Sequence, residues 1–209
     1  MAASLNSLKT TAESPANDLL AWAPTFDTHH ASLAEALTKA RALIAEMEAG
    51  QPGRWLTITG LQGVGKTFLA RQMLERSKLS NPGRHALWSP PGASGIRRDC
   101  DARPYCIWLD ATRMAERMRA GEYDLPESFG TDWCLVVDDI GAARDKTDFL
   151  AEGLYRLANS RLGRWTIWTS NLSLKEIAER IDPRLASRLI RDENQIVTIS
   201  APDYALRHR

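Results

Sequence analysis

A glycine-rich segment in the first third of the chain carries the residue types that bind phosphate. Residues 60–67 read Gly-Leu-Gln-Gly-Val-Gly-Lys-Thr and match the pattern G-x-x-x-x-G-K-[ST] in full. Glycines let successive backbone N–H groups turn toward one anion, and a helix that begins at the lysine adds the positive end of its dipole. Lys66 is expected to reach the β- and γ-phosphates, and Thr67 to offer its hydroxyl to Mg²⁺. The predicted cofactor-binding residues are Gly60, Gly63, Val64, Gly65, Lys66, Thr67 and Phe68.

Two aspartates, Asp138 and Asp139, follow an apolar run that reads as a buried parallel strand. Such a strand delivers its last side chains to the edge where open α/β sheets bind ligands. Asp138 is expected to hold Mg²⁺ opposite Thr67, and Asp139 to polarise an attacking water as a general base. The same pattern also arises by chance in turns, so the complete phosphate loop earlier in the chain is what favours the functional interpretation.

Polar residues also follow the next apolar segment. Residues 165–171 end in Thr-Ser-Asn, which can place Asn171 near the γ-phosphate and the attacking water, or at the cap of the next helix. Further on, Arg184 and Arg188 lie four residues apart, on one face of a predicted helix. They form either a solvated, ion-paired face, or a pair from which one arginine enters a neighbouring subunit's site. In the second case it would stabilise transition-state charge, an effect worth about 10³–10⁵ in rate.

Apolar segments of strand and helix type alternate along the chain around these polar residues. Strands are expected over residues 55–59, 105–109, 133–138, 165–170 and 195–199, and helices over residues 68–74, 111–120, 148–161, 174–180 and 184–191. Asp110 is the expected N-cap of the helix over 111–120. Five strands alternating with helices predict a three-layer α/β fold around a five-stranded parallel sheet.

The N-terminal part divides into a tail and a helix. Residues 1–24 are rich in Ala, Ser, Thr and Asn and predict a flexible tail, so the folded core is expected over residues 25–209. A helix is expected over residues 32–49, with Ser32 and Glu35 as a capping box. Residues 79–104 are rich in Pro, Gly and Arg and predict a long irregular connection.

Composition limits the function classes. A net charge of +1 over 209 residues provides no global basic field, so contacts with nucleic acid must come from local patches. The helix over 111–120 offers one, with Arg113 and Arg117 on one face, although a solvated basic face is an equal alternative. Three cysteines form no closed disulfide framework and no zinc-ligand pattern. The polar start and the lack of a bilayer-length apolar run indicate a cytoplasmic protein without a membrane span.

Several of these segments, in this order, resemble the AAA+ ATPase domain of DnaC-type replicative helicase loaders and of the related IstB-type transposition helpers. They are residues 135–141, 169–173 and 184–189 together with Asp203-Tyr204, and the resemblance covers residues 25–204. It implies that Lys66 and Thr67 form the Walker A site, Asp138 and Asp139 the Walker B site, and Asn171 sensor 1. It also implies that Arg188 is the arginine finger, with Arg184 as a second candidate, and that Phe26 lies near the adenine.

The resemblance implies a function as well as a fold. It implies an ATPase that uses ATP and Mg²⁺, binds single-stranded DNA, self-associates into a ring or spiral, and has a hexameric replicative helicase as its partner. The sequence departs from many AAA+ proteins in having Asp139 where glutamate is common, which implies slow hydrolysis, and in ending soon after the fifth strand, without a C-terminal helical lid domain. A transposition helper, a P-loop kinase for a small molecule and a nucleotide-dependent scaffold are the alternatives.

Overall fold

A computed structural model describes residues 26–79, 106–141, 149–191 and 193–207. The predicted tail over 1–24, nearly all of the predicted connection over 79–104, and Asp148 lie outside the described residues. None of the helices in the described ranges is long and apolar enough to cross a membrane.

The core of the fold is a five-stranded sheet in which every pair of neighbouring strands is parallel. The strands are β1 (Trp55–Gly60), β2 (Cys106–Asp110), β3 (Cys134–Ile140), β4 (Trp165–Ser170) and β5 (Gln195–Ile199). Their spatial order is β2-β3-β4-β1-β5, so β1 lies between the fourth and fifth strands of the sequence. Because all strands run the same way, the residues that follow β1, β3 and β4 meet at one edge of the sheet.

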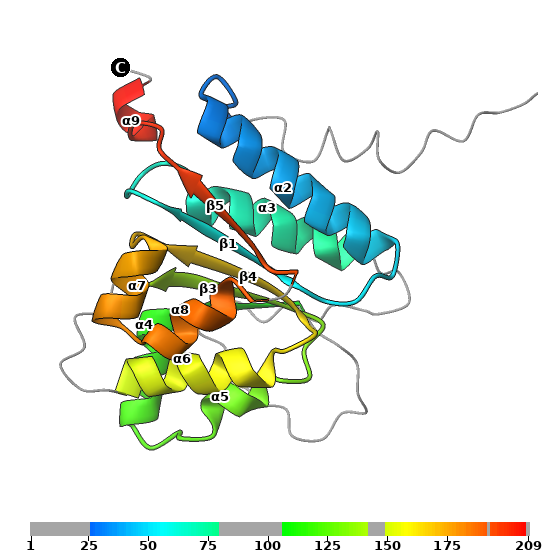
Figure 1. The fold of residues 1–209 in the computed structure, drawn as a ribbon. Helices are drawn as coiled ribbons and strands as arrows, with labels where there is room; N and C mark the ends of the chain where they lie inside the picture. Colours follow the sequence, from blue (N-terminus) through cyan, green and yellow to red (C-terminus); the bar gives the residue numbers. More distant parts are fainter. Residues whose placement is uncertain (1–25, 80–105, 142–148, 192, 208–209) are drawn as a thin grey trace, which may run out of the picture.

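Helices cover both faces of the sheet, which gives the predicted three layers (Figure 1). One face is covered by α2 (Ala31–Glu48) and α3 (Lys66–Leu79), and the opposite face by α4 (Ala111–Arg119), α5 (Leu125–Ser128), α6 (Phe149–Ser160), α7 (Leu174–Arg180) and α8 (Pro183–Leu189). Alternate residues of each strand serve the two layers: Leu56 and Ile58 pack under α2 and α3, whereas Trp55 packs on the other side.

The predicted elements are all present. The bounds predicted for β4, α7 and β5 are those of the structure. Helix α3 begins at Lys66, as the phosphate-loop pattern implies, and is longer than expected because it continues to Leu79. Asp110 caps α4 as predicted, since its side chain accepts a hydrogen bond from the N–H of Arg113. Two short helices, α5 and α9 (Tyr204–Arg207), were not predicted, because four residues are too few to show a helical period.

The predicted start of the first helix is wrong. The N-cap of α2 is His30, whose side chain accepts from the N–H of Ser32, so Ser32 and Glu35 do not form a capping box. The hydroxyl of Ser32 instead accepts a hydrogen bond from the N–H of Ser200, just after β5. The Ser32 side chain, which the local pattern assigned to the helix cap, therefore makes a tertiary contact with the segment after β5 instead.

Candidate nucleotide-binding site

The predicted phosphate loop connects the end of β1 to the first residue of α3. The N–H of Tyr204 donates to the carbonyl of Gly63 at 3.0 Å, so the segment after β5 packs on this loop. A side chain at Gly63 would place its Cβ 1.8 Å from Oδ2 of Asp203, and the contact therefore requires glycine. Three loop glycines have φ between +76° and +144°, namely Gly60, Gly63 and Gly65. Such backbone conformations form the N–H-lined cradle that the sequence pattern predicts.

Lys66 is the hub of the polar contacts in the loop. Its ammonium donates to the carbonyls of Gly60 at 2.9 Å and Leu61 at 2.7 Å, and to Oδ1 of Asn171 at 2.7 Å. The side chain is buried, and burial lowers the pKa of Lys66, against the pull of the carboxylates at the end of β3. A buried ammonium surrounded by neutral oxygens is a strong attractor for a phosphate oxygen, because its charge is only partly compensated.

Asp138 lies between two threonine hydroxyls. Thr67, the second residue of α3, donates to Oδ1 at 3.1 Å, and Thr169 of β4 donates to the same oxygen at 2.6 Å. The structure thus brings the predicted metal-binding pair, Thr67 and Asp138, into direct contact. Hydroxyl and carboxylate oxygens are the ligands that Mg²⁺ prefers, and Mg²⁺ on phosphates typically takes only one or two of them from protein.

Asp139 points to a different partner from its neighbour. Its carboxylate accepts from Nδ2 of Asn171 at 2.7 Å, while its own N–H donates to the Thr169 hydroxyl at 2.8 Å. Burial raises the pKa of Asp139, and the adjacent Asp138 raises it further, with Lys66 opposing both. A raised pKa improves a carboxylate as a proton acceptor, which suits the general-base role predicted for it.

Asn171 is not a helix cap. The N-cap of α7 is Ser173, which forms a capping box with Glu176. The amide of Asn171 instead joins Lys66 to Asp139, so the alternative that it serves the next helix is excluded. The structure therefore brings the loop, both aspartates and Asn171 together at the carboxyl edge of the sheet.

A cavity of about 530 Å³ opens beside these residues. Its lining includes Lys66, Asp139 and Asn171. It also includes two aromatic rings, Phe26 and Phe68, which lie nearly parallel with centroids 6.3 Å apart. The other lining residues are Asp27, Leu33, Gln62, Gly63, Val64, Gly65, Thr67 and Tyr204. The cavity therefore offers both aromatic surface and polar groups to a ligand, and Phe26, which the resemblance implies to lie near the adenine, is one of its lining residues.

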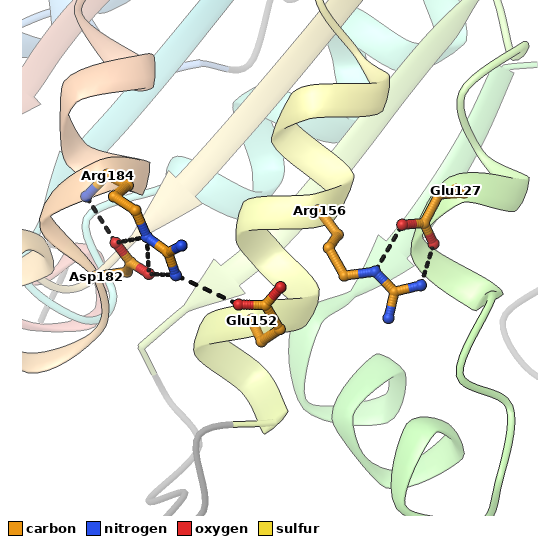
Figure 2. A network of polar contacts seen from close by, with 5 residues as sticks. All are labelled: Glu127, Glu152, Arg156, Asp182 and Arg184. Atoms are coloured by element: carbon orange, nitrogen blue, oxygen red, sulfur yellow. Dashed lines mark hydrogen bonds and ion pairs between the residues drawn. The ribbon is translucent and has the colours of Figure 1, made fainter.

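Arg184 and Arg188 lie elsewhere, on α8, and neither lines the cavity. Arg184 is held by Asp182, with Nη2 2.7 Å from Oδ2, and also pairs with Glu152 of α6 at 3.3 Å. Figure 2 shows this contact between α8 and α6, and the second contact by which Arg156 joins α6 to Glu127 on α5. The guanidinium of Arg184 also stacks 4.1 Å above the Tyr155 ring.

The second arginine has different surroundings. Arg188 is half-buried. Two side-chain hydrogen bonds lower the pKa of the Tyr155 phenol: the one with Asn159 has the larger effect, and the one with Arg188 adds to it. Among the described residues no carboxylate pairs with Arg188.

The predicted DNA-binding residues lie on α4. Met114 and Met118 are buried beside Gly153 of α6, whereas Arg113 is exposed. Arg117 is bound by Glu122, with Nε 2.9 Å from Oε1, so its charge is partly compensated. Within the described ranges no three His, Cys, Asp or Glu side chains cluster as a metal site of their own.

The role of Thr169 at the site was missed in the sequence. Thr169 contacts both aspartates, yet within its strand it looked like any other β-branched residue. Two signals were available: Thr169 begins the segment 169–173 that carries the family resemblance, and it lies two residues before Asn171, at the end of the strand.

The sheet order, the loop and the two acids define a P-loop fold of the AAA+ type. Solved structures with this fold include a DnaC helicase loader, with 22% identity, a TM-score of 0.62, and coverage of 84% of this chain and 94% of that one. A structure of DnaI has 18% identity, a TM-score of 0.59, and coverage of 85% and 86%. The replication initiator DnaA bound to AMPPCP and single-stranded DNA has 16% identity and a TM-score of 0.52, covering 78% of this chain but 46% of its own. No protein-family model matches the chain, and a search of curated proteins finds no match.

Proposed function

We propose that this protein is an ATP-dependent loader of a replicative helicase: an AAA+ ATPase that binds Mg-ATP and single-stranded DNA and helps to place a hexameric helicase on DNA. The observation that carries the nucleotide part is the contact network from Lys66 through Asn171 to Asp139, beside the Thr67–Asp138 pair. The loader part is supported by the likeness of the fold to DnaC and DnaI.

Different residues around the cavity would bind different parts of the nucleotide. The loop N–H groups and Lys66 would hold the phosphates, and the rings of Phe26 and Phe68 would hold the base. Thr67 and Asp138 supply the two oxygens that would hold Mg²⁺. When bound, Mg²⁺ neutralises phosphate charge and polarises the bond to be broken.

Asp139 and Asn171 would act on the attacking water. The raised pKa of Asp139 favours proton acceptance, and Asn171 fixes the direction of its carboxylate by donating to Oδ1. Because Asn171 also accepts from Lys66, a phosphate that draws Lys66 away would release the amide to turn toward the γ-phosphate. The same side chain would thereby report whether the site holds ATP.

A neighbouring subunit would complete the site. Arg184 and Arg188 lie outside the cavity of their own chain, so either can act only on another chain's nucleotide. Arg188 is the better candidate, since Arg184 is already paired with two carboxylates. We infer that ATP stabilises a ring or spiral of subunits in this way, and that hydrolysis loosens it and releases the helicase.

Single-stranded DNA would be bound mainly through phosphate contacts from α4. Arg113 is exposed and available for such a contact, whereas Arg117 must first leave Glu122. Contacts of this kind are independent of base sequence and weaken with added salt.

The test is ATP hydrolysis with and without a single-stranded oligonucleotide, for the parent, Lys66→Ala and Arg188→Ala. Both variants are expected to lose activity, and their mixture to regain part of it, because one supplies an intact loop and the other an intact arginine. Arg180→Ala, at an exposed arginine of α7 that pairs with Glu176 of the same helix, is the control and should remain active. Full activity of Arg188→Ala at low protein concentration would contradict the shared site. Binding of the purified protein to a hexameric replicative helicase, with and without ATP, tests the partner.

A further inference from the structure

Strand β3 has one residue more than its neighbour β4 where the two acids lie. Val137 is paired with Trp168, but the next pair is Ile140 with Ser170, so Asp138 and Asp139 together stand opposite Thr169. This is a β-bulge, and it turns two successive side chains in directions that a regular strand does not allow. Asp139 has φ +58°, the one described non-glycine residue with positive φ, a conformation that side chains rarely adopt.

The Thr169 hydroxyl contacts both sides of this bulge. It donates to Oδ1 of Asp138 at 2.6 Å and accepts from the N–H of Asp139 at 2.8 Å, and the residue is fully buried. A hydroxyl has a single hydrogen and accepts through its lone pairs, so one group serves both contacts. Valine has the same shape and can serve neither, whereas serine can serve both.

We propose that Thr169 is a positioning residue that holds the two acids in their separate directions. It keeps Asp138 turned toward Thr67, where Mg²⁺ would bind, and it fixes the backbone of Asp139 so that its carboxylate reaches Asn171. This inference rests on the proposed function, since it gives a role in binding Mg-ATP to a residue outside the cavity.

A second contact holds the far side of the bulge. The hydroxyl of Ser170 donates to the carbonyl of Ile140 at 2.6 Å and accepts from the N–H of Leu172. We therefore expect the bulge to remain when Thr169 is replaced, and the direction of the Asp138 carboxylate to change most. Partners that orient a metal-binding carboxylate typically contribute about 10- to 100-fold to metal affinity.

The experiment measures binding of a fluorescent ATP analogue while Mg²⁺ is titrated, for the parent, Thr169→Val and Thr169→Ser. Thr169→Val is expected to need about tenfold more Mg²⁺ for half-maximal tight binding, and to bind the analogue like the parent when EDTA is present. Thr169→Ser is expected to titrate like the parent. The matched control is Thr57→Val on β1, because Thr57 is also fully buried and its hydroxyl has no hydrogen-bond partner among the described residues.

Parent-like Mg²⁺ dependence of folded Thr169→Val, or a shifted dependence of Thr169→Ser, would overturn the inference. Should Thr169→Val fail to fold, amide hydrogen exchange of the parent decides instead: the Asp139 N–H must exchange slowly, and fast exchange refutes its contact with Thr169. Failure of the proposed function looks different, because the parent itself would then bind the analogue independently of Lys66 or not at all.

Discussion

The ammonium of Lys66 lies 2.7 Å from Oδ1 of Asn171, although 105 residues separate the two in the sequence. The sheet order explains this contact, because β4 lies between β1, which leads into the loop, and β3, which carries the acids. A side chain that follows β4 can therefore contact both the phosphate loop after β1 and the acids of β3. The Asn171 amide makes both contacts: its oxygen accepts a hydrogen bond from Lys66, and its nitrogen donates one to Asp139.

Replacing Asn171 by alanine is expected to separate hydrolysis from binding. Asn171→Ala leaves the loop glycines and Lys66 in place, so ATP binding should remain close to that of the parent. Hydrolysis should fall by about 10²–10³, the usual cost of losing one oriented donor at a reacting group. The control is Ser173→Ala, which removes the cap of α7 and should cost about 1 kcal/mol of stability while leaving hydrolysis intact. Equal hydrolysis rates in Asn171→Ala and the parent would remove Asn171 from the site.

Local pattern was sufficient to predict the strands, the phosphate loop and the two acids. The loop has a fixed spacing of glycines and lysine, and buried parallel strands are continuous apolar runs, so both are visible without knowledge of contacts. Asn171 could be placed at the end of its strand, but its partners depended on which strands are neighbours. Sheet order is set by packing between distant segments, and the insertion of β1 between β4 and β5 has no local signal.

Tertiary contacts between distant segments explain the features of the structure that the sequence did not predict. The bulge places Asp138 and Asp139 opposite Thr169 of another strand, and Ser32 binds Ser200 instead of capping α2. Arg161, just after α6, is another case: it is fully buried and donates to the carbonyls of Phe129 at 2.8 Å and Trp165 at 2.6 Å. A charged residue at the end of an amphipathic helix gives no sign that it will be enclosed in this way.

The two arginines of α8 are expected to differ in effect. Arg188→Ala should reduce DNA-stimulated ATP hydrolysis by about 10³-fold or more if it acts on a neighbouring subunit's nucleotide. Arg184→Ala should have a much smaller effect, because Asp182, Glu152 and the Tyr155 ring already hold that guanidinium (Figure 2).

The measurement that separates the two arginines is complementation by Lys66→Ala, which has an intact α8 but no functional loop. Adding it should raise the activity of Arg188→Ala strongly and that of Arg184→Ala hardly at all. The reverse pattern would assign the trans-acting role to Arg184.

A pH dependence of stability is expected from Asp132, a buried residue just before β3. Burial raises its pKa to about 7, against the attraction of Arg161 and Arg164. The folded protein therefore keeps the proton up to about pH 7, whereas the unfolded chain releases it near pH 3.8. The stability that this protonated group contributes is fully present below the lower value and is lost as the pH rises through the higher one.

Asp132→Asn keeps a neutral side chain of similar size at every pH. Its advantage over the parent in free energy of unfolding should grow between pH 5 and 7, by at most about 1.4 kcal/mol per pH unit, and level off above that. Urea denaturation at several pH values measures this difference. Asp124→Asn, at a fully exposed carboxylate, is the control and should track the parent throughout. A constant difference between Asp132→Asn and the parent would show that Asp132 is ionised in the folded protein across this range.

The contact between the phosphate loop and the C-terminal segment makes Gly63 sensitive to any side chain. Gly63 has φ +76° and Gly163 has φ +69°, so alanine meets similar backbone strain at both, about 1–2 kcal/mol. Only at Gly63 would the new Cβ also strike a neighbour, the Asp203 carboxylate, since nothing lies within 4 Å at Gly163. Gly63→Ala is therefore expected to lose more stability in urea than Gly163→Ala and, alone of the two, to weaken ATP binding. Adding Asp203→Ala to Gly63→Ala should restore part of both losses, and no recovery would show that backbone strain, rather than this contact, limits the loop.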